Sequence, residues 1–202
     1  MTLSIYGIAQ SRTFRTLWMA QELGLAYEHV RVGFADGGVK QESFLAINPN
    51  GRIPAIKDGD FTLWESLAIN LYLAKRYGRG LYPTAIEEEA KTWQWSFWGM
   101  SEVEPSLTTW AYNTIILPPE QRDAAKAAEA LKALATPLAV LEKSLAGRDY
   151  LLGGAFTVAD LNLASIMFRV RGFDLAGQAK VKGWLERCYA RPAALAAIKL
   201  RG

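Results

Sequence analysis

The sequence predicts an α/β domain with a small mixed sheet, followed by an all-helical domain. Two observations indicate this division. Every segment with strand character lies in residues 1–80 of the 202, and no strand pattern returns after the glycine- and proline-containing stretch Gly78–Pro83. The predicted domains are therefore residues 1–80 and residues 86–202.

The first domain is predicted to begin with a strand, a helix and a second strand. Leu3–Tyr6 alternates in polarity, as a short strand does. From Ser11 onward apolar residues recur at helical spacing, with Ser11 as the predicted N-cap and Gly24 as the stop. Tyr27–Val32 has the β-branched and aromatic content of a strand. This order favours a parallel pair of strands with a right-handed crossover.

A hairpin and a further helix complete the first domain. Ile53–Ile56 and Phe61–Leu63 flank the turn signal Lys57–Asp60, and a short helix is expected before them. An amphipathic helix is then predicted from Trp64 to Tyr77. The hairpin adds antiparallel strands, so the sheet is mixed. Pro54 is unexpected in a strand, because proline has no N–H to give to a sheet ladder.

The second domain carries helical signals only. Acidic residues at 87–89 suit the positive end of a helix dipole. Ala124–Leu145 is alanine-rich, and Pro137 within it predicts a kink or a break. Thr157 and Asp160 have the spacing of a capping box. The helix that follows is apolar enough to lie at the centre of its domain.

Composition excludes several classes of protein. The net charge is only +3 and the basic residues do not cluster, which argues against a nucleic-acid partner. The chain has one cysteine, Cys188, and one histidine, His29, which excludes an internal disulfide, a CxxC redox pair and a Cys/His zinc site. Because neither a signal-peptide pattern nor an 18-residue apolar run is present, we expect a cytoplasmic protein without a membrane partner. The single cysteine and single histidine also lead us to expect no metal.

Several short motifs, taken in order, resemble the cytosolic glutathione transferase family along the whole chain. None is specific alone, whereas their order and spacing are. They are Tyr6-Gly7-Ile8-Ala9-Gln10-Ser11, Asn48-Pro49-Asn50-Gly51-Arg52-Ile53-Pro54, Glu65-Ser66, Leu81-Tyr82-Pro83 and the Thr157–Asp160 capping box. Ser11-x-x-x-Arg15 resembles the serine-using, phi- and theta-like classes of plants and bacteria. The resemblance implies a thioredoxin-like N-terminal domain and an all-α C-terminal domain.

The resemblance also implies a glutathione site in the first domain. It implies that Pro54 is cis and that the backbone of Ile53 pairs with the cysteinyl backbone of glutathione, as an open strand edge can pair with a peptide. The alternative is an edge-strand proline that blocks pairing. Ser66, at a helix start, would hold the γ-glutamyl carboxylate, and Glu65 would attract its ammonium group. Both residues can also be ordinary helix caps.

Lys40 and Arg52 are expected to meet the glycine carboxylate at the other end of glutathione. Relatives often carry a His-Lys pair where this chain has Val39-Lys40. One expected contact is therefore missing, which would weaken the affinity for glutathione. The alternative for Lys40 is a solvated surface side chain.

Ser11 is the first candidate for activating the glutathione thiol. A free thiol has a pKa near 8.5, and lowering it by about two units requires ~2.7 kcal/mol of preferential stabilisation of the thiolate. One hydroxyl donor together with a helix N-terminus can supply that amount. The alternative is a serine that only caps the helix. Tyr6, at the end of the first strand, is the second choice and Thr13 the third.

The electrophile would bind near the start of the second domain, where aromatic residues concentrate. Most of them are expected to be core. Trp110 and Tyr112, near Pro105 where a helix should be disturbed, are the candidates that family analogy selects. Cys188 is expected in the core, and His29 without a catalytic duty.

The resemblance thus implies a glutathione S-transferase with glutathione as co-substrate, and no metal is expected. It would be a cytoplasmic homodimer of detoxification that conjugates glutathione to a small apolar electrophile, with glutathione peroxidase activity as an additional option. The first alternative is a non-catalytic binding or protein-interaction module on the same fold. A thiol-disulfide or dehydroascorbate-type reductase is disfavoured, because no cysteine lies near the start of the first helix. Fold analogy does not identify the electrophile.

Overall fold

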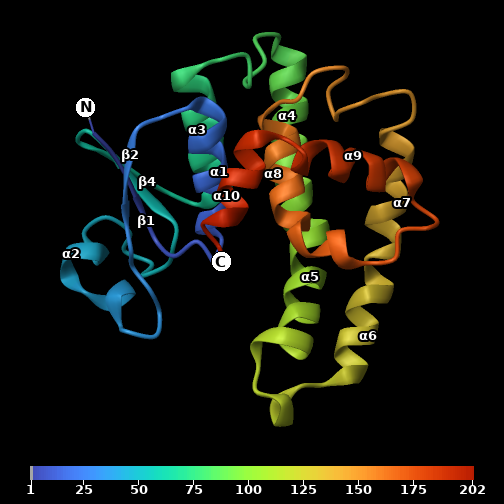
Figure 1. The fold of residues 1–202 in the computed structure, drawn as a ribbon, viewed down its shortest axis with the longest axis horizontal. Coiled ribbons are helices and arrows are strands. Elements are labelled where there is room, and N and C mark those ends of the chain that lie inside the picture. Colours follow the sequence, from blue (N-terminus) through green and yellow to red (C-terminus); the bar gives the residue numbers. More distant parts are fainter. Residues whose placement is uncertain (1) are drawn as a thin grey trace. The chain divides into compact units, whose positions relative to one another are not determined.

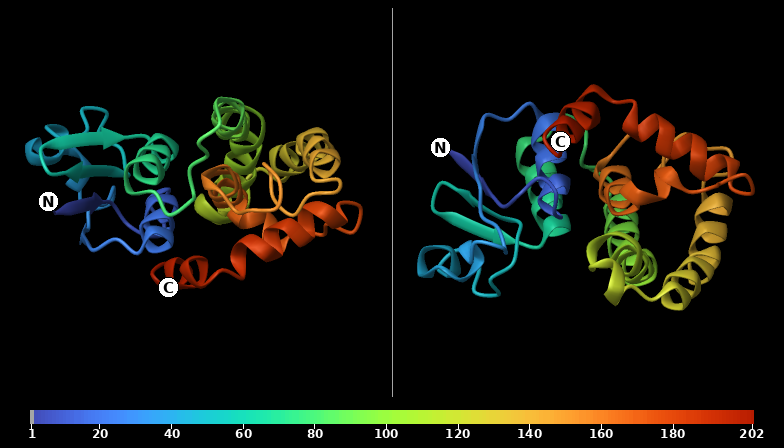
Figure 2. Two further views of the ribbon diagram at one scale, coloured as in Figure 1. Left: turned by 90° about the horizontal axis from the view of Figure 1, so that it is seen from above. Right: turned by 60° about the horizontal axis from the view of Figure 1, so that its bottom comes forward.

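The computed structural model describes residues 2–202, which divide into two compact units. One unit runs to Pro83 and also contains Tyr189–Gly202, and the other is Thr84–Cys188. Figures 1 and 2 show the elements of each. This division differs from the predicted domain 86–202 at its end, because the last helix packs against the first helix of the chain.

The first unit contains a four-stranded mixed sheet in the order β2-β1-β3-β4. Strand β1 (Leu3–Tyr6) pairs in parallel with β2 (Tyr27–Val30) and antiparallel with β3 (Ala55–Asp58). Strand β4 (Phe61–Trp64) pairs antiparallel with β3, and Trp64 is the ladder partner of Ala55. The predicted mixed sheet is confirmed, whereas the predicted helical start at Trp64 is wrong, because that residue still belongs to the hairpin.

Helices α1 (Thr13–Leu23) and α3 (Ser66–Tyr77) pack against each other and against the sheet (Figure 1). Gly24 ends α1 in the left-handed conformation, as predicted for the stop. The 3-10 turn η1 (Gly38–Lys40) and the short helix α2 (Glu42–Leu45) lie between β2 and β3. The core of the unit is built from fully buried apolar side chains, among them Ile5, Phe14, Leu17, Trp18, Ile56, Ile69 and Leu73.

A buried carboxylate fixes α3 against β3. Asp58, the last residue of β3, accepts hydrogen bonds from the Tyr72 hydroxyl at 2.8 Å and the Tyr77 hydroxyl at 2.9 Å. The Arg76 guanidinium lies 3.3 Å from the same carboxylate. Burial, and then the hydrogen bond to Asp58, raises the pKa of Tyr72 to about 12. The neutral tyrosine is therefore favoured as the donor.

The second unit is helical. Its elements are α4 (Ile86–Trp98), the π-helical segment η2 (Gly99–Val103), α5 (Glu104–Ala111), the π-helical segment η3 (Tyr112–Ile116), the 3-10 turn η4 (Pro119–Gln121), α6 (Ala124–Ala133), α7 (Ala135–Ser144), α8 (Val158–Ile166), the 3-10 segment η5 (Met167–Gly172) and α9 (Ala179–Tyr189). The alanine-rich stretch breaks at Leu134, so that Pro137 falls in the first turn of α7, where proline is tolerated. The C-terminal helix α10 (Pro192–Lys199) belongs to the first unit.

Asp160 organises the centre of the second unit. The predicted capping box with Thr157 is present, and every residue of α8 is buried. The Asp160 carboxylate accepts from the Leu151 N–H at 2.8 Å, the Trp184 indole N–H at 2.9 Å, and the Thr157 N–H and hydroxyl at 2.9 and 3.1 Å. Burial raises the pKa of the Asp160 carboxyl, whereas these four donors favour the ionised form. The cap therefore also joins two distant segments to α8.

Three further findings concern the burial of Cys188, membrane-spanning helices and metal-binding groups. Cys188 is fully buried, as expected for a core residue. Within residues 2–202, none of the helices combines the length and the apolar content that crossing a membrane requires. The same residues contain no group of three or more His, Cys, Asp or Glu side chains placed to hold a metal ion.

Replacing Asp160 by asparagine should lower the free energy of unfolding by about 3 kcal/mol. An asparagine presents one acceptor oxygen and an NH₂ group where the structure directs four donors, so buried donors lose their partner. Denaturant unfolding followed by tryptophan fluorescence measures this change. Asp123→Asn is the matched control, because Asp123 is the partly exposed N-cap of α6 and asparagine is an equally good cap. Equal effects of the two substitutions would contradict the organising role of Asp160.

Replacing Tyr72 by phenylalanine should change how stability depends on alkaline pH. The folded-state pKa of about 12 lies above the ordinary value of 10.0, so the contribution of Tyr72 is fully present below pH 10 and is lost as the pH rises through 12. The stability difference between wild type and Tyr72→Phe should therefore shrink over that range. Denaturant titrations at several pH values measure it. Tyr112→Phe, at an exposed ring, is the matched tyrosine-to-phenylalanine control.

Candidate functional site

Ser11 lies in the turn that connects β1 to α1. Helix α1 begins at Thr13 with Arg12 as its N-cap, so the predicted cap at Ser11 is wrong by one position. The Ser11 side chain nevertheless takes part in the helix start, since the Thr13 N–H donates to its Oγ at 3.1 Å. The Ser11 hydroxyl lies 2.7 Å from the Ile8 carbonyl oxygen and 2.9 Å from Thr13 Oγ1. A half-buried hydroxyl therefore sits at the positive end of α1.

Gly7 fixes the entry to this turn. Its φ is 138°, and a β-carbon here would overlap Thr13 Oγ1, so no larger residue fits. The Gly7 N–H donates to the Val30 carbonyl at 2.9 Å, and His29 Nε2 lies 2.9 Å from the Gly7 carbonyl oxygen. Strand β2 therefore holds the turn on one side. This contact places the chain's only histidine against the turn.

The two competitors of Ser11 lie in different surroundings. Tyr6 is half-buried, and its ring lies 6.2 Å from that of Phe44, against a small apolar cluster of Val39, Phe44, Ile53 and Ala55. Thr13 is fully buried, and its Oγ1 is engaged with Ser11. Of the three hydroxyl groups, that of Ser11 combines partial exposure with a helix start.

The peptide bond between Ile53 and Pro54 is cis, as the resemblance implies. Both residues precede β3, whose registered pairs with β1 and β4 begin at Ala55. The Ile53 side chain is buried in the small apolar cluster. The proline therefore lies at the entrance of the strand and takes no place in the ladder, which resolves its unexpected presence there.

Asn48 holds the loop that leads to Pro54. Its buried side chain donates to the Arg52 carbonyl at 2.6 Å and accepts from the Asn50 N–H at 3.1 Å, while its own carbonyl accepts from the Gly51 N–H at 3.0 Å. Gly51 has a φ of 58°. Sequence reasoning used Asn48 only as part of a family motif. A buried amide is the kind of residue that closes such a loop on itself.

Lys40 and Arg52 are both exposed and lie on neighbouring segments. The Lys40 ammonium nitrogen lies 3.4 Å from the position that a β-carbon on Gly51 would take, next to the loop that carries Arg52. Val39, in contrast, points into the apolar cluster and is only 3% exposed. Position 39 therefore contributes packing, whereas the two cations lie on the surface.

Glu65 and Ser66 form the start of α3. Glu65 is exposed and adopts φ 75° and ψ 110°, which is strained for a residue with a side chain. Ser66 is 5% exposed, and its Oγ lies 3.4 Å from Arg15 Nη1. Sequence reasoning used Arg15 only for its spacing from Ser11. A charged residue among the apolar positions of α1 could have indicated that Arg15 has a role in the site. The structure places this buried cation beneath the N-terminus of α3.

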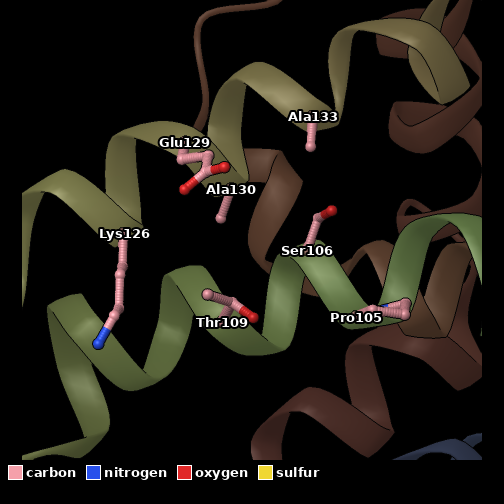
Figure 3. Close-up of a pocket in the computed structure, with 7 residues that line it drawn as sticks. All are labelled: Pro105, Ser106, Thr109, Lys126, Glu129, Ala130 and Ala133. Carbon is pink, nitrogen blue, oxygen red and sulfur yellow. The ribbon is translucent and has the colours of Figure 1, made fainter.

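The aromatic candidates of the second unit are not equivalent. Trp110 is half-buried and packs edge-on against Phe173, with ring centroids 4.7 Å apart, while Tyr112 is exposed at the start of η3. The expected disturbance near Pro105 is present, because the π-helical segment η2 ends directly before α5. A groove between α5 and α6 is shown in Figure 3. It is lined by Pro105, Ser106, Thr109, Lys126, Glu129, Ala130 and Ala133, and therefore by neither aromatic candidate.

Comparisons with known proteins agree on one family. The protein-family model described as "Glutathione S-transferase, N-terminal domain" matches residues 1–75. The family model described as "Glutathione S-transferase, C-terminal domain" matches residues 105–192. Glutathione S-transferase 3 of Zea mays is 36% identical over 202 residues, covering 95% of this chain and 90% of the relative. Glutathione S-transferase F10 of Arabidopsis thaliana is 33% identical over 168 residues, covering 80% and 77%.

Solved structures agree with the sequence comparisons. The theta class glutathione S-transferase of Xanthomonas axonopodis pv. citri, solved with glutathione bound, is 33% identical with a TM-score of 0.91 and covers 98% of this chain and 97% of that one. Glutathione transferase F7 of Populus trichocarpa is 27% identical with a TM-score of 0.90 over the full length of both chains.

The predicted fold, with an α/β thioredoxin-like unit and a helical unit, is confirmed as that of the glutathione transferases. The chain belongs to the glutathione S-transferase family. Its curated relatives are named as enzymes, which favours the catalytic prediction over the non-catalytic alternative.

Replacing Gly51 by alanine should lower the free energy of unfolding by about 2 kcal/mol. The positive φ costs a side chain about 1 kcal/mol, and the new β-carbon would lie 2.9 Å from the Val39 carbonyl oxygen. Gly147→Ala is the matched control, since Gly147 has φ 72° but no atom within 4 Å of the added carbon. It should carry the cost of φ alone. Equal losses in thermal or denaturant unfolding would show that the approach of Val39 is unimportant.

Proposed function

We propose that this chain is a glutathione transferase in which Ser11 activates the glutathione thiol for attack on a small apolar electrophile. The observation that carries this proposal is the position of the Ser11 hydroxyl directly before α1. Its oxygen accepts the Thr13 N–H, which polarises the hydroxyl and strengthens it as a donor. The relatives named as glutathione transferases, one of them solved with glutathione bound, support the choice of ligand.

Glutathione would lie along the edge formed by Ile53 and Pro54. The sheet ladder begins only at Ala55, and the backbone of Ile53 would pair with the cysteinyl residue of the ligand, as an added strand does. The γ-glutamyl carboxylate would bind at the start of α3, to the Ser66 hydroxyl and the backbone N–H groups there. Glu65 would attract the γ-glutamyl ammonium group. The charge of buried Arg15 adds to the positive potential behind Ser66.

The glycine carboxylate would meet Lys40 and Arg52. Both side chains are exposed, and Lys40 lies beside the loop that Asn48 closes. Because Val39 faces the apolar cluster, this end of the ligand would depend on these two cations. Surface pairs of this kind contribute up to about 1 kcal/mol each, so we expect moderate affinity that falls with added salt.

In the reaction, the thiol proton leaves to solvent and Ser11 stabilises the thiolate that remains. For this, the Ser11 hydroxyl turns from the Ile8 carbonyl to donate to the sulfur. A hydrogen bond to a charged group contributes about 1.5–3 kcal/mol and the helix end about 0.3–1 kcal/mol, which together reach the ~2.7 kcal/mol needed. The sulfur electron pair then forms the C–S bond, and the leaving group departs with the electron pair of the bond that breaks.

The proposal also covers the electrophile site, the oligomeric state and the cellular setting. Trp110 and Tyr112 remain the candidates for contacting the apolar electrophile. We also propose a homodimer, because each unit exposes large apolar side chains. They are Phe61 and Trp64 on β4, and Ile86, Trp93 and Phe97 on α4. The scarcity of cysteine fits a reducing, cytoplasmic setting. A role in detoxification would follow from the proposed conjugation of apolar electrophiles.

Ser11→Ala should lower kcat/KM for glutathione with an aryl halide about 100-fold, because one donor to the developing thiolate is lost. The affinity for glutathione, measured by calorimetry, should change little. Ser144→Ala is the matched control, since the hydroxyl of this serine donates to the Val140 carbonyl on α7 and its loss should leave turnover unchanged. Failure of the wild-type protein to bind glutathione at millimolar concentration would contradict the proposed transferase activity. Unchanged turnover in Ser11→Ala would move the role to Tyr6 or to backbone amides.

A further inference from the structure

Helix α10 is fastened to α1 at both of its ends. Arg191, directly before α10, forms a two-pronged ion pair with Glu22 near the end of α1, at 2.7 and 2.8 Å. Ala194 and Ala197 are fully buried between the two contacts. Two residues beyond α10, Arg201 reaches the turn that precedes α1. The two helices therefore pack against each other and run antiparallel.

The Arg201 guanidinium faces three consecutive carbonyl groups of the turn. Its Nη1 donates to the Ala9 oxygen at 2.9 Å and lies 3.5 Å from the Ser11 oxygen, while Nη2 lies 3.4 Å from the Gln10 oxygen. The Gln10 side chain donates back to the Arg201 carbonyl at 2.6 Å. The guanidinium carbon also lies 5.0 Å from the centroid of the Phe14 ring. Arg201 thus contacts both the segment that connects β1 to α1 and the beginning of α1 itself.

These contacts have a specific chemical consequence. Three carbonyl oxygens that point to one place repel one another unless a donor or a cation compensates them. A planar guanidinium offers several N–H donors at fixed angles and stacks on an aromatic ring, which an ammonium group does not reproduce. Arg201 is therefore suited to set the conformation of the Ala9–Ser11 backbone and not only to attach α10.

We propose that Arg201 is a positioning residue for the thiol-activating serine. It holds the carbonyls of Ala9, Gln10 and Ser11 so that the Ser11 hydroxyl stays at the start of α1, within reach of the thiolate. This inference rests on the proposed function for its catalytic consequence. Its structural part, a turn held by Arg201, stands on the contacts alone.

The test compares Arg201→Met with Arg191→Met. Both substitutions remove an arginine that ties α10 to α1. Arg201 contacts the turn before α1, whereas Arg191 pairs with Glu22 near the other end of α1. One readout is hydrogen exchange at the amides of Ser11, Thr13 and Phe14, all of which bond within the turn. The others are the pKa of the bound glutathione thiol, from thiolate absorbance against pH, and kcat/KM with an aryl halide.

In Arg201→Met we expect faster exchange at these amides, a thiol pKa higher by about one unit and kcat/KM lower by about tenfold. Arg191→Met should leave all three as in the wild type, even if it lowers thermal stability equally. Arg201→Lys should restore only part of the effect, because it keeps the charge without the planar fork.

The possible results separate the inference from the function that it deepens. Unchanged exchange in Arg201→Met would overturn the positioning role, whatever the wild type does with glutathione. Faster exchange with an unchanged thiol pKa and unchanged turnover would overturn its catalytic consequence. Equal effects of Arg191→Met on exchange and thiol pKa would reduce Arg201 to a helix anchor and overturn the proposal. A wild type that neither binds glutathione nor turns over would contradict the proposed function and this catalytic consequence together, while the exchange data still decide the structural part.

Discussion

The turn from Gly7 to Arg12 is the constraint on which the first unit depends. Within a few residues the chain must leave the pairing of β1 with β2 and β3 and enter α1, so several backbone groups have no partner in either element. Two other segments of the chain supply hydrogen-bond partners for these backbone groups. Strand β2 supplies His29 and the Val30 carbonyl to Gly7, and the segment after α10 supplies Arg201 to the following carbonyls. The position of the Ser11 hydroxyl is a result of both.

The remaining parts of the proposed ligand cradle depend on buried polar groups that are satisfied by hydrogen bonds. Asn48 closes the loop before Pro54, and Asp58 ties α3 to β3 through two tyrosines. Asp160 performs the same task in the helical unit. In each case a polar side chain is removed from water and compensated by donors or acceptors from distant segments, which makes the local geometry specific. Of the groups proposed to contact glutathione, Arg52 lies in the loop that Asn48 closes, and Glu65 and Ser66 begin the helix that Asp58 ties to β3.

Sequence reasoning predicted much of the fold because its signals are local. The stop at Gly24, the capping box at Thr157 and Asp160, and the disturbed helix near Pro105 follow from neighbours within a few residues. The mixed sheet follows from the order of elements that are themselves predicted locally. The predictions were wrong at the ends of elements where strand pairing decides which element a residue belongs to. Trp64 has helical spacing with later residues, but its ladder partner Ala55 keeps it in the hairpin. Similarly, an Arg12 cap with Ser11 bonding to the Thr13 N–H looks the same in sequence as a Ser11 cap.

The sequence by itself determined the order of the elements, the family motifs and the residue types available for the site, because periodicity, caps and turn residues act over short distances. Only the tertiary structure decided that Val39 faces the core, that Arg15 lies beneath Ser66, and that Arg201 reaches a turn some 190 positions earlier. These placements depend on which buried surfaces meet and on which backbone groups lack a partner after the elements have packed. Such requirements are properties of the folded chain, and no window of sequence contains them.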